Sequence, residues 1–187
     1  MKHIQLMLLI FLFSFGYAQK HTERTYYDNG QLKEKKNFKN DKLEGICQFW
    51  HDNGQLEFEG YFRHGKKEGK HNWYYATGQL EFEENYKNGR KNGLWKGWWE
   101  NGQLEYEGNF RDDKRDEGWR AYYDNGGVKK ETKFILERRV SQKCFTENGE
   151  KMDCDDILEP VWWWQQEKCL DQHGNIIICD EFYLGNF

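Results

Sequence analysis

The sequence predicts an all-β protein in which tandem β-hairpin repeats form an elongated, twisted antiparallel sheet, with small disulfide-clamped C-terminal hairpins. The first observation is a turn dipeptide that returns about every 24 residues together with the columns around it. The second is the alternation of apolar and charged residues after each turn, which is the period of a half-buried strand. The third is an aromatic content of 18% with a single proline. The dipeptides are Asn29-Gly30, Asn53-Gly54, Thr77-Gly78, Asn101-Gly102 and Asn125-Gly126.

The first 18 residues predict export. Lys2 precedes an apolar run over 4–15, and small residues stand at Gly16 and Ala18, which is typical of a signal peptide cleaved before Gln19. The run of about 12 apolar residues is too short to span a bilayer, so we expect no transmembrane segment in the mature chain. We expect a secreted or periplasmic protein, and an uncleaved anchor is the alternative. The predicted domains are a signal peptide over 1–18, repeats over 19–136 and a cysteine-hairpin extension over 137–187.

The charge of the chain argues against a nucleic-acid partner. The sequence has 28 basic and 32 acidic residues, and cleavage before Gln19 removes one lysine and no acid. The mature chain is therefore mildly acidic and has no basic tract. A phosphate backbone requires clustered Lys and Arg side chains, so we expect no nucleic acid.

The clearest repeat, residues 93–111, is predicted to be a hairpin with Asn101-Gly102 as the centre of a type I′ turn. Each glycine then lies opposite a ring on one face, and opposite charges meet on the other. Glu117 stands where the other repeats have glycine, which predicts a bulge or a slipped connection. The short charged segments between repeats, such as 63–68 and 87–92, are expected to be turns. The predicted pairs are Trp99–Leu104, Gly97–Tyr106, Trp95–Gly108, Gly93–Phe110, Lys96–Glu107, Trp98–Glu105 and Arg120–Glu131.

The columns from Gly93 to Phe110 read Gly-x-Trp-x-x-Trp-x-x-Asn-Gly-Gln-Leu-x-x-Glu-Gly-x-Phe. This pattern resembles the bacterial variant of the MORN repeat, which the YwqK-type antitoxin-like family also carries. The resemblance covers Tyr26 to about Phe134. It implies β-hairpin units and a binding or scaffold role, and it brings no catalytic residues and no cofactor.

A second duplication follows the repeats. Cys144 and Cys154 stand ten positions apart around an Asn-Gly turn, and Cys169 and Cys179 stand ten apart around a His-Gly turn. In an exported protein we expect two local disulfides, Cys144–Cys154 and Cys169–Cys179, each contributing on the order of 2–3 kcal/mol. Zinc binding is the alternative for these thiols. Cys47 falls in the column of Trp95 and Trp119, which favours a small buried core residue over a reactive thiol.

The residues of the usual enzymes are missing from the sequence, so we expect no enzyme. Ser141 is the only serine after Gln19, and no Gly-rich phosphate loop is present. His51, His64 and His71 fall at unrelated positions of the repeat, which argues against a metal site. A hydrolase using dispersed carboxylates is a third, weaker hypothesis.

One surface is a candidate binding site. An aromatic column and an acidic column recur once per repeat and are predicted to share the charged face of the sheet, where rings and acids suit peptides, sugars or cationic groups. The competing interpretation is that the rings only pack within the sheet. The first hypothesis is a protein-interaction scaffold, and the second is a module that binds glycans of the cell wall or envelope. Trp162-Trp163-Trp164 is a further candidate patch. The predicted surface consists of Tyr26, Trp50, Tyr74, Trp98, Tyr122, Glu57, Glu81 and Glu105.

Overall fold

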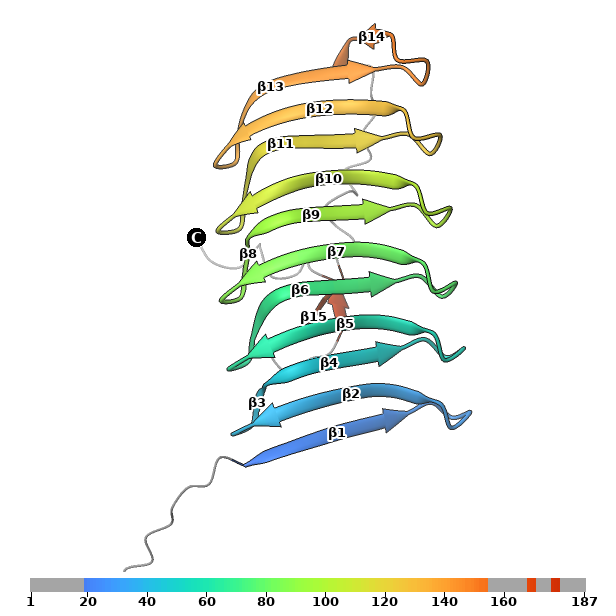
Figure 1. Ribbon diagram of the computed structural model, residues 1–187, viewed down its shortest axis with the longest axis vertical. Helices are drawn as coiled ribbons and strands as arrows, with labels where there is room; N and C mark the ends of the chain where they lie inside the picture. Colours follow the sequence, from blue (N-terminus) through green and yellow to red (C-terminus); the bar gives the residue numbers. More distant parts are fainter. Residues whose placement is uncertain (1–18, 155–167, 171–175, 179–187) are drawn as a thin grey trace, which may run out of the picture.

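The computed structural model describes residues 19–154, 168–170 and 176–178, and these residues confirm the all-β prediction (Figure 1). Fourteen strands form one open antiparallel sheet in the order β1-β2-β4-β5-β6-β7-β9-β10-β11-β12-β13-β14, with β3 beside β2 and β8 beside β7. The strands are β1 (Lys20–Tyr26), β2 (Leu32–Lys39), β3 (Lys42–Leu43), β4 (Gly45–Trp50), β5 (Leu56–Arg63), β6 (Lys66–Tyr74), β7 (Leu80–Lys87), β8 (Arg90–Lys91), β9 (Gly93–Trp98), β10 (Leu104–Arg111), β11 (Lys114–Tyr122), β12 (Val128–Ile135), β13 (Arg138–Phe145) and β14 (Lys151–Met152). The predicted signal peptide and Trp162-Trp163-Trp164 lie outside the described residues.

The sheet is a meander, so its two long edges are built from different connections (Figure 1). The turn edge carries the Asn-Gly turns within the repeats, and the link edge carries the links between repeats. The part of the chain with described coordinates contains no helix that could cross a membrane.

The turn within each repeat is one residue longer than predicted. In the β9–β10 hairpin, the Gly102 NH donates to the Trp99 carbonyl and the Trp99 NH donates to the Gln103 carbonyl, each at 2.8 Å. Gly102 has a φ of 84°, whereas Asn101 is not among the residues with positive φ. This geometry is a type I turn followed by a left-handed glycine, so the predicted type I′ turn is wrong.

The longer turn changes the pairing only beside it. Trp98 lies opposite Leu104, so the predicted pairs Trp99–Leu104 and Trp98–Glu105 are wrong. Beyond this shift the predicted register is confirmed. The confirmed pairs are Gly97–Tyr106, Trp95–Gly108, Gly93–Phe110, Lys96–Glu107 and Arg120–Glu131.

The five links are two-residue turns of type I′, in which both central residues have positive φ. Their central residues are Asn40-Asp41, His64-Gly65, Asn88-Gly89, Asp112-Asp113 and Leu136-Glu137. Each later link is bonded to the repeat before it: for example, the Gly89 NH donates to the Lys67 carbonyl at 2.9 Å. Successive links are therefore stacked at the spacing of the repeats.

A recurring backbone conformation explains the glycine at the start of most repeats. Gly45, Gly69 and Gly93 all have positive φ at the start of a repeat, and Glu117 takes the same conformation with a φ of 61°. Glu117 still lies opposite Phe134. The bulge predicted near Glu117 is present as a register shift between β10 and β11. The β5–β6 pair has a register shift at the equivalent place. The bulge therefore belongs to the repeat, and the fourth copy keeps it without glycine.

The Asn-Gly-Gln sequence holds neighbouring turns together along the turn edge. The Asn53 Oδ1 atom accepts from the Gln55 NH at 2.9 Å, and its Nδ2 donates to the Ala76 carbonyl in the next turn at 2.7 Å. The Gln55 side chain lies against Gly78 of that turn, where a Cβ would come within 2.7 Å of its Oε1 atom. Asn29 and Asn101 repeat both hydrogen bonds.

The core is a layer of rings on one face of the sheet, which we call the ring face. Phe58 stacks between Phe49 and Trp73, with centroid distances of 5.2 and 4.5 Å. Farther along, Trp95 meets Phe110 at 4.9 Å. Rings also cross glycines, because a Cβ on Gly97 would lie 2.3 Å from Tyr106 and one on Gly108 would lie 2.0 Å from Trp119. Cys47 is buried in the first cluster, as the core interpretation predicted.

The described part of the cysteine extension contains one disulfide. Cys144 in β13 is bonded to Cys154, with 5.2 Å between their Cα atoms. This confirms the first predicted bridge. β15 (Lys168–Leu170) pairs with β16 (Ile176–Ile178), which places Cys169 opposite Ile177. Cys179 lies outside the described residues, so the second bridge stays a prediction.

Candidate interaction face

The face opposite the rings is covered by paired charges, and we call it the charged face. Lys70 lies 2.7 Å from Glu83, Lys96 lies 3.7 Å from Glu107 and Arg120 lies 3.1 Å from Glu131. Gln48 donates to Glu59 at 2.7 Å in the corresponding place of the β4–β5 hairpin. Each pair joins the two strands of one hairpin, so the charges of this face largely neutralise one another.

The predicted aromatic column lies on the charged face. Trp98 is two residues from Lys96 in β9, and Tyr122 is two residues from Arg120 in β11, so in each strand the ring shares a face with the charge. Trp50, Tyr74, Trp98 and Tyr122 are half-buried, whereas Tyr26 is 59% exposed. The Tyr122 hydroxyl donates to Glu107 at 3.0 Å. The column therefore offers partly exposed rings that the sheet holds in place.

The predicted acidic column is half-buried, and burial changes the chemistry of Glu105. Burial raises the pKa of Glu105 to about 7, with Lys129 opposing the shift and Glu81 adding to it. Burial also raises the pKa of Tyr75 to about 12, and Glu81 and Glu105 contribute because they lie near it. Near neutral pH, Glu105 can therefore both donate and accept hydrogen bonds. The structure places Glu57 at the equivalent position of β5, where it is also half-buried.

A ladder of side-chain hydrogen bonds supports the ends of the strands that carry the aromatic column. The Tyr75 hydroxyl donates to the Trp98 carbonyl at 2.8 Å, and His51 donates to the Tyr74 carbonyl at 2.8 Å. Tyr27 and Tyr123 bond to the carbonyls of Trp50 and Phe145 in the same way. In the equivalent position, Trp99 has a buried Nε1 with no hydrogen-bond partner. The ladder fixes neighbouring repeats so that the aromatic column stays in register.

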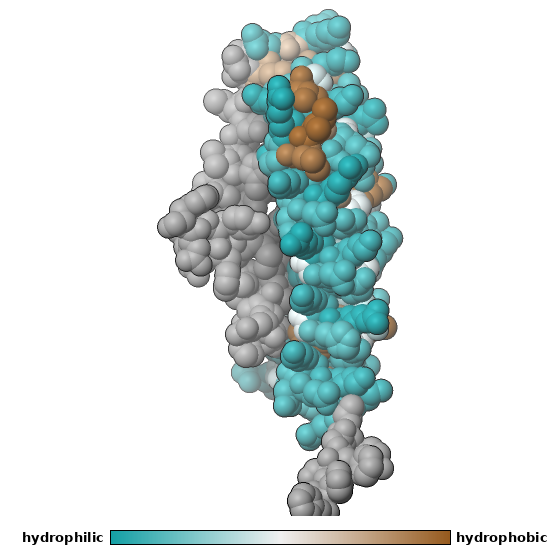
Figure 2. All heavy atoms as spheres, turned by 90° about the vertical axis from the view of Figure 1, so that its left-hand side faces the viewer, coloured by the Kyte–Doolittle hydropathy of each residue, from teal (hydrophilic) through white to brown (hydrophobic). Residues whose placement is uncertain are grey.

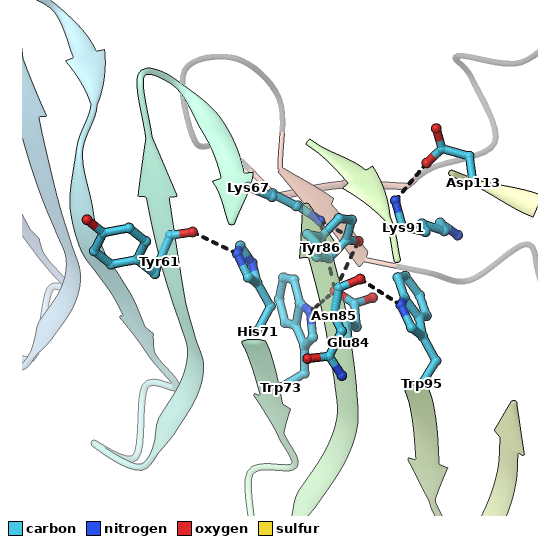
Figure 3. A network of polar contacts seen from close by, with 10 residues as sticks. All are labelled: Tyr61, Lys67, His71, Trp73, Glu84, Asn85, Tyr86, Lys91, Trp95 and Asp113. Carbon is cyan, nitrogen blue, oxygen red and sulfur yellow. Dashed lines mark hydrogen bonds and ion pairs between the residues drawn. The ribbon is translucent and has the colours of Figure 1, made fainter. Parts of the chain in front are cut away.

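The ring face contains a buried polar cluster around Glu84 (Figure 3). The Glu84 carboxylate accepts from Trp73 Nε1 at 3.3 Å and from the Tyr86 hydroxyl at 3.2 Å, and Lys67 Nζ lies 3.9 Å away. Lys67 also donates to the Tyr86 hydroxyl at 2.9 Å. The carboxylate is thus closely partnered within the core, and this cluster stabilises the fold.

His71 belongs to the packing of the same face. Its Nε2 donates to the Tyr61 carbonyl at 2.9 Å, as Trp95 Nε1 does to the Asn85 carbonyl at 3.0 Å (Figure 3). Trp119 Nε1 donates to the Asn109 carbonyl in the same way, also at 3.0 Å. Burial lowers the pKa of His71 to about 3, and Lys67 adds to that shift. The histidine therefore replaces a core tryptophan and stays neutral.

Two features of the surface were not identified from the sequence. The first is a pocket of about 270 Å³ beside β11 and β12, lined by Trp95, Phe110, Trp119, Arg115 and Arg139 among others. The second is a set of basic residues that face each other across the links, such as Arg63 and Lys66. The sequence did contain a signal for these basic residues, because they recur on both sides of the links in successive repeats without forming a continuous tract.

The structure brings together no metal site in the region that it describes, where no three His, Cys, Asp or Glu side chains are arranged to hold an ion. His64 is exposed beside Glu44, whereas His51 and His71 each bond to a main-chain carbonyl. Ser141 is exposed on β13.

Comparison with protein families tests the repeat assignment. One family model matches residues 22–40, 43–64, 67–88 and 91–112. These four tandem segments match the MORN repeat variant. MORN repeats commonly mediate interactions with proteins or membranes, and the family is generally non-catalytic. Although the match ends at residue 112, the β11–β12 hairpin continues the MORN-like register to Phe134. A search of curated proteins found no match.

Proposed function

We propose that this chain is an exported, non-catalytic repeat protein whose charged face is a scaffold for a protein partner. The observation that carries the proposal is the aromatic column, which presents Trp50, Tyr74, Trp98 and Tyr122 in register on one face beside the acidic column. Tyr and Trp are enriched among the residues that dominate binding energy, because rigid rings give contact area at a small entropic cost.

The size of the face suits a protein. Neighbouring strands are about 4.8 Å apart and residues rise about 3.3 Å along a strand, so ten strands with six residues each cover roughly 48 by 20 Å. This area is about 1,000 Å², which exceeds the roughly 800 Å² that one partner contributes to a standard interface. The internal charge pairs also favour a protein partner, because a neutralised face can be desolvated at less cost than unpaired charges.

Two further observations support the other parts of the proposal. The Cys144–Cys154 disulfide supports export, since such bonds persist in oxidising compartments. The match to the MORN repeat variant, a generally non-catalytic repeat, supports binding over catalysis. A turnover assay on glycosides that stays at background would agree with the non-catalytic role, and any turnover lost in Glu81→Gln and Glu105→Gln would contradict it.

The decisive experiment is site-specific crosslinking in the native cell envelope. A photoreactive residue at Lys70, which is exposed within the charged face, should crosslink one identified protein. The double variant Tyr74→Ala/Trp98→Ala should lose that crosslink while its thermal unfolding stays cooperative. The control Ile135→Ala/Val140→Ala, which truncates two exposed apolar residues outside the predicted surface, should keep it. If the double variant is instead already unfolded at room temperature, those rings are needed for packing and the proposal is contradicted.

A glycan-binding module is the second candidate. It is favoured by the straight column of partly exposed rings, because sugars stack on such rings in a row. A glycan array probed with the full chain separates the two functions: specific binding to envelope glycans that Tyr74→Ala/Trp98→Ala abolishes would replace the protein partner.

A further inference from the structure

The link edge holds like charges opposite each other. Across the first three links, Lys39 pairs with Lys42, Arg63 with Lys66 and Lys87 with Arg90. Like charges directly opposite each other on a ladder are destabilising. Three copies of an unfavourable pair at one edge therefore point to a role outside the sheet, and we call these three pairs the basic rungs.

The basic rungs are available to a partner. Five of the six side chains are exposed and Lys39 is half-buried. Figure 2, which faces the link edge, shows hydrophilic side chains along most of it, and the exposed apolar residues Ile135 and Leu136 lie at the fifth link. Within the described part of the chain, none of the six basic side chains forms an ion pair; these are Lys39, Lys42, Arg63, Lys66, Lys87 and Arg90.

Acids near the rungs are engaged by the backbone or lie farther along the edge. Glu44 accepts from the His64 NH and Glu68 accepts from the Asn88 NH, both at 2.7 Å. At the fourth link, Arg111 forms an ion pair with Asp116 at 2.6 Å. Arg111 also lies opposite Lys114 there, but this ion pair and the acidic link residues Asp112 and Asp113 offset the basic pair, so we restrict the basic rungs to the first three links.

The spacing of the rungs is fixed. Each repeat adds two strands to the sheet, so successive rungs are about 9.6 Å apart. The hydrogen bonds from the Gly65 NH to Leu43 and from the Gly89 NH to Lys67, both 2.9 Å, hold the links at this interval. A partner that places one anionic group per rung must therefore have the same period.

The geometry points to an acidic protein segment in the polyproline II conformation, with a carboxylate at every third residue, as the ligand of the basic rungs. Polyproline II has three residues per turn and rises about 3.1 Å per residue, so such carboxylates lie on one side about 9.3 Å apart. Same-face residues of a β-strand are about 6.7 Å apart, which does not fit. A seven-residue step on an α-helix is about 10.5 Å and drifts around the axis.

The chemistry of the rungs agrees with carboxylates. The second and third rungs each combine one arginine with one lysine, and the arginine fork binds a carboxylate through two hydrogen bonds. The first three links contain no Phe, Tyr or Trp, whereas single-stranded nucleic acids bind through bases stacked on such rings. This inference shares with the proposed function a protein partner, but it uses the link edge, at the opposite end of the strands from the aromatic column.

The test uses the full chain and two labelled peptides of equal composition. One peptide repeats Glu-Pro-Pro four times, and the other places its four glutamates in one block before eight prolines. Fluorescence anisotropy at low salt should give an affinity at least about tenfold higher for the periodic peptide, falling as salt is raised. Equal affinities would show attraction by net charge alone and would overturn the inference.

Paired variants localise the site. Arg63→Gln/Lys87→Gln removes one charge from each of two rungs and should weaken periodic-peptide binding at least about tenfold without lowering the melting temperature, because it relieves like-charge pairs. The control Arg24→Gln/Lys33→Gln makes the same charge change at exposed residues of β1 and β2 away from the links and should bind normally. Retained binding by the first variant would overturn the inference. Binding to phosphatidylglycerol vesicles or oligouronates in place of the peptide would also overturn it.

The two proposals fail separately. Tyr74→Ala/Trp98→Ala should keep periodic-peptide binding because those rings lie beside the turn edge, at the ends of β6 and β9 that are far from the links. Arg63→Gln/Lys87→Gln should keep the crosslink formed from Lys70. Loss of peptide binding in the ring variant would assign the peptide to the aromatic column and would contradict the separate site at the basic rungs.

Discussion

Replacing Glu117 with glycine should stabilise the protein. Glu117 has a φ of 61° where the other repeats have Gly45, Gly69 and Gly93 with the same sign of φ. A residue with a Cβ in the left-handed region costs roughly 1–2 kcal/mol, whereas glycine adopts it freely. Part of this gain is lost, because glycine is more flexible in the unfolded chain by roughly 0.5–1 kcal/mol.

The side chain of Glu117 offers little to lose. It is 64% exposed and lies 3.9 Å from Arg111, and Asn109 donates to it at 3.3 Å. Exposed contacts of this kind typically contribute about a few tenths of a kcal/mol to the free energy of unfolding. The expected net gain is about 0.5–1 kcal/mol, which raises the melting temperature by about 1–4 °C in a chain of this size.

Urea unfolding with the disulfide intact measures the effect as a shift in midpoint at constant slope. Glu117→Ala is the matched control, because it removes the same contacts but keeps a Cβ in the left-handed conformation. Gly118→Ala tests the neighbouring position, where φ is not positive and a Cβ meets nothing within 4 Å, and it should be nearly neutral. If Glu117→Gly is no more stable than Glu117→Ala, backbone strain at this position is refuted.

Three further predictions concern single positions. Thr77→Asn should add, at its own turn, the two hydrogen bonds that Asn53 forms at the preceding one, and should stabilise the protein by about 0.5–1 kcal/mol in urea unfolding. Asn53→Thr should destabilise the protein by a similar amount, and the same sign for both variants would contradict the role of these bonds. Because burial lowers the pKa of His71 to about 3, stability should be complete above pH 6.5 and fall by up to about 1.4 kcal/mol per pH unit below it, a slope that His71→Gln removes. Because burial raises the pKa of Glu105 to about 7, its contribution is present below about pH 4.5 and lost as pH rises through 7. Glu105→Gln should therefore be more stable than the parent at pH 8, on the order of 1 kcal/mol after allowance for partial exposure, and equal stabilities at pH 8 would refute the shift.

The repeat and its register were predictable because side-chain size and charge constrain them strongly. Gly97 must face Tyr106, since a Cβ there would lie 2.3 Å from the ring. A slip of one residue would also separate Lys96 from Glu107 and move both to the wrong face. The fold, the cross-strand pairs and the Cys144–Cys154 bridge follow from such local constraints.

The candidate site was less predictable, because burial depends on neighbouring repeats. The sequence places Trp98 and Glu105 in recurring columns, but it does not indicate that burial raises the Glu105 pKa to about 7. The basic rungs were also missed, because Arg63 and Lys87 come from different repeats and lie along one edge only when the sheet stacks the links. A search for runs of consecutive basic residues misses this edge. Its charges are found only by comparing the same position in successive repeats.

The turn types show where the local sequence no longer determines the backbone conformation. Asn-Gly occurs both at Asn101-Gly102, in a type I turn with a left-handed glycine, and at Asn88-Gly89, in a type I′ link. The dipeptide fits either geometry, because each places the second residue in the left-handed region, which glycine adopts freely, and only type I′ also requires a left-handed residue before it. Thr77-Gly78 was the informative copy: a β-branched residue is a conformational outlier at positive φ, which excludes type I′ for its column. The opposite substitution, Leu136 with a φ of 47°, shows that the stacked sheet can impose type I′ on a link whose own residues oppose it.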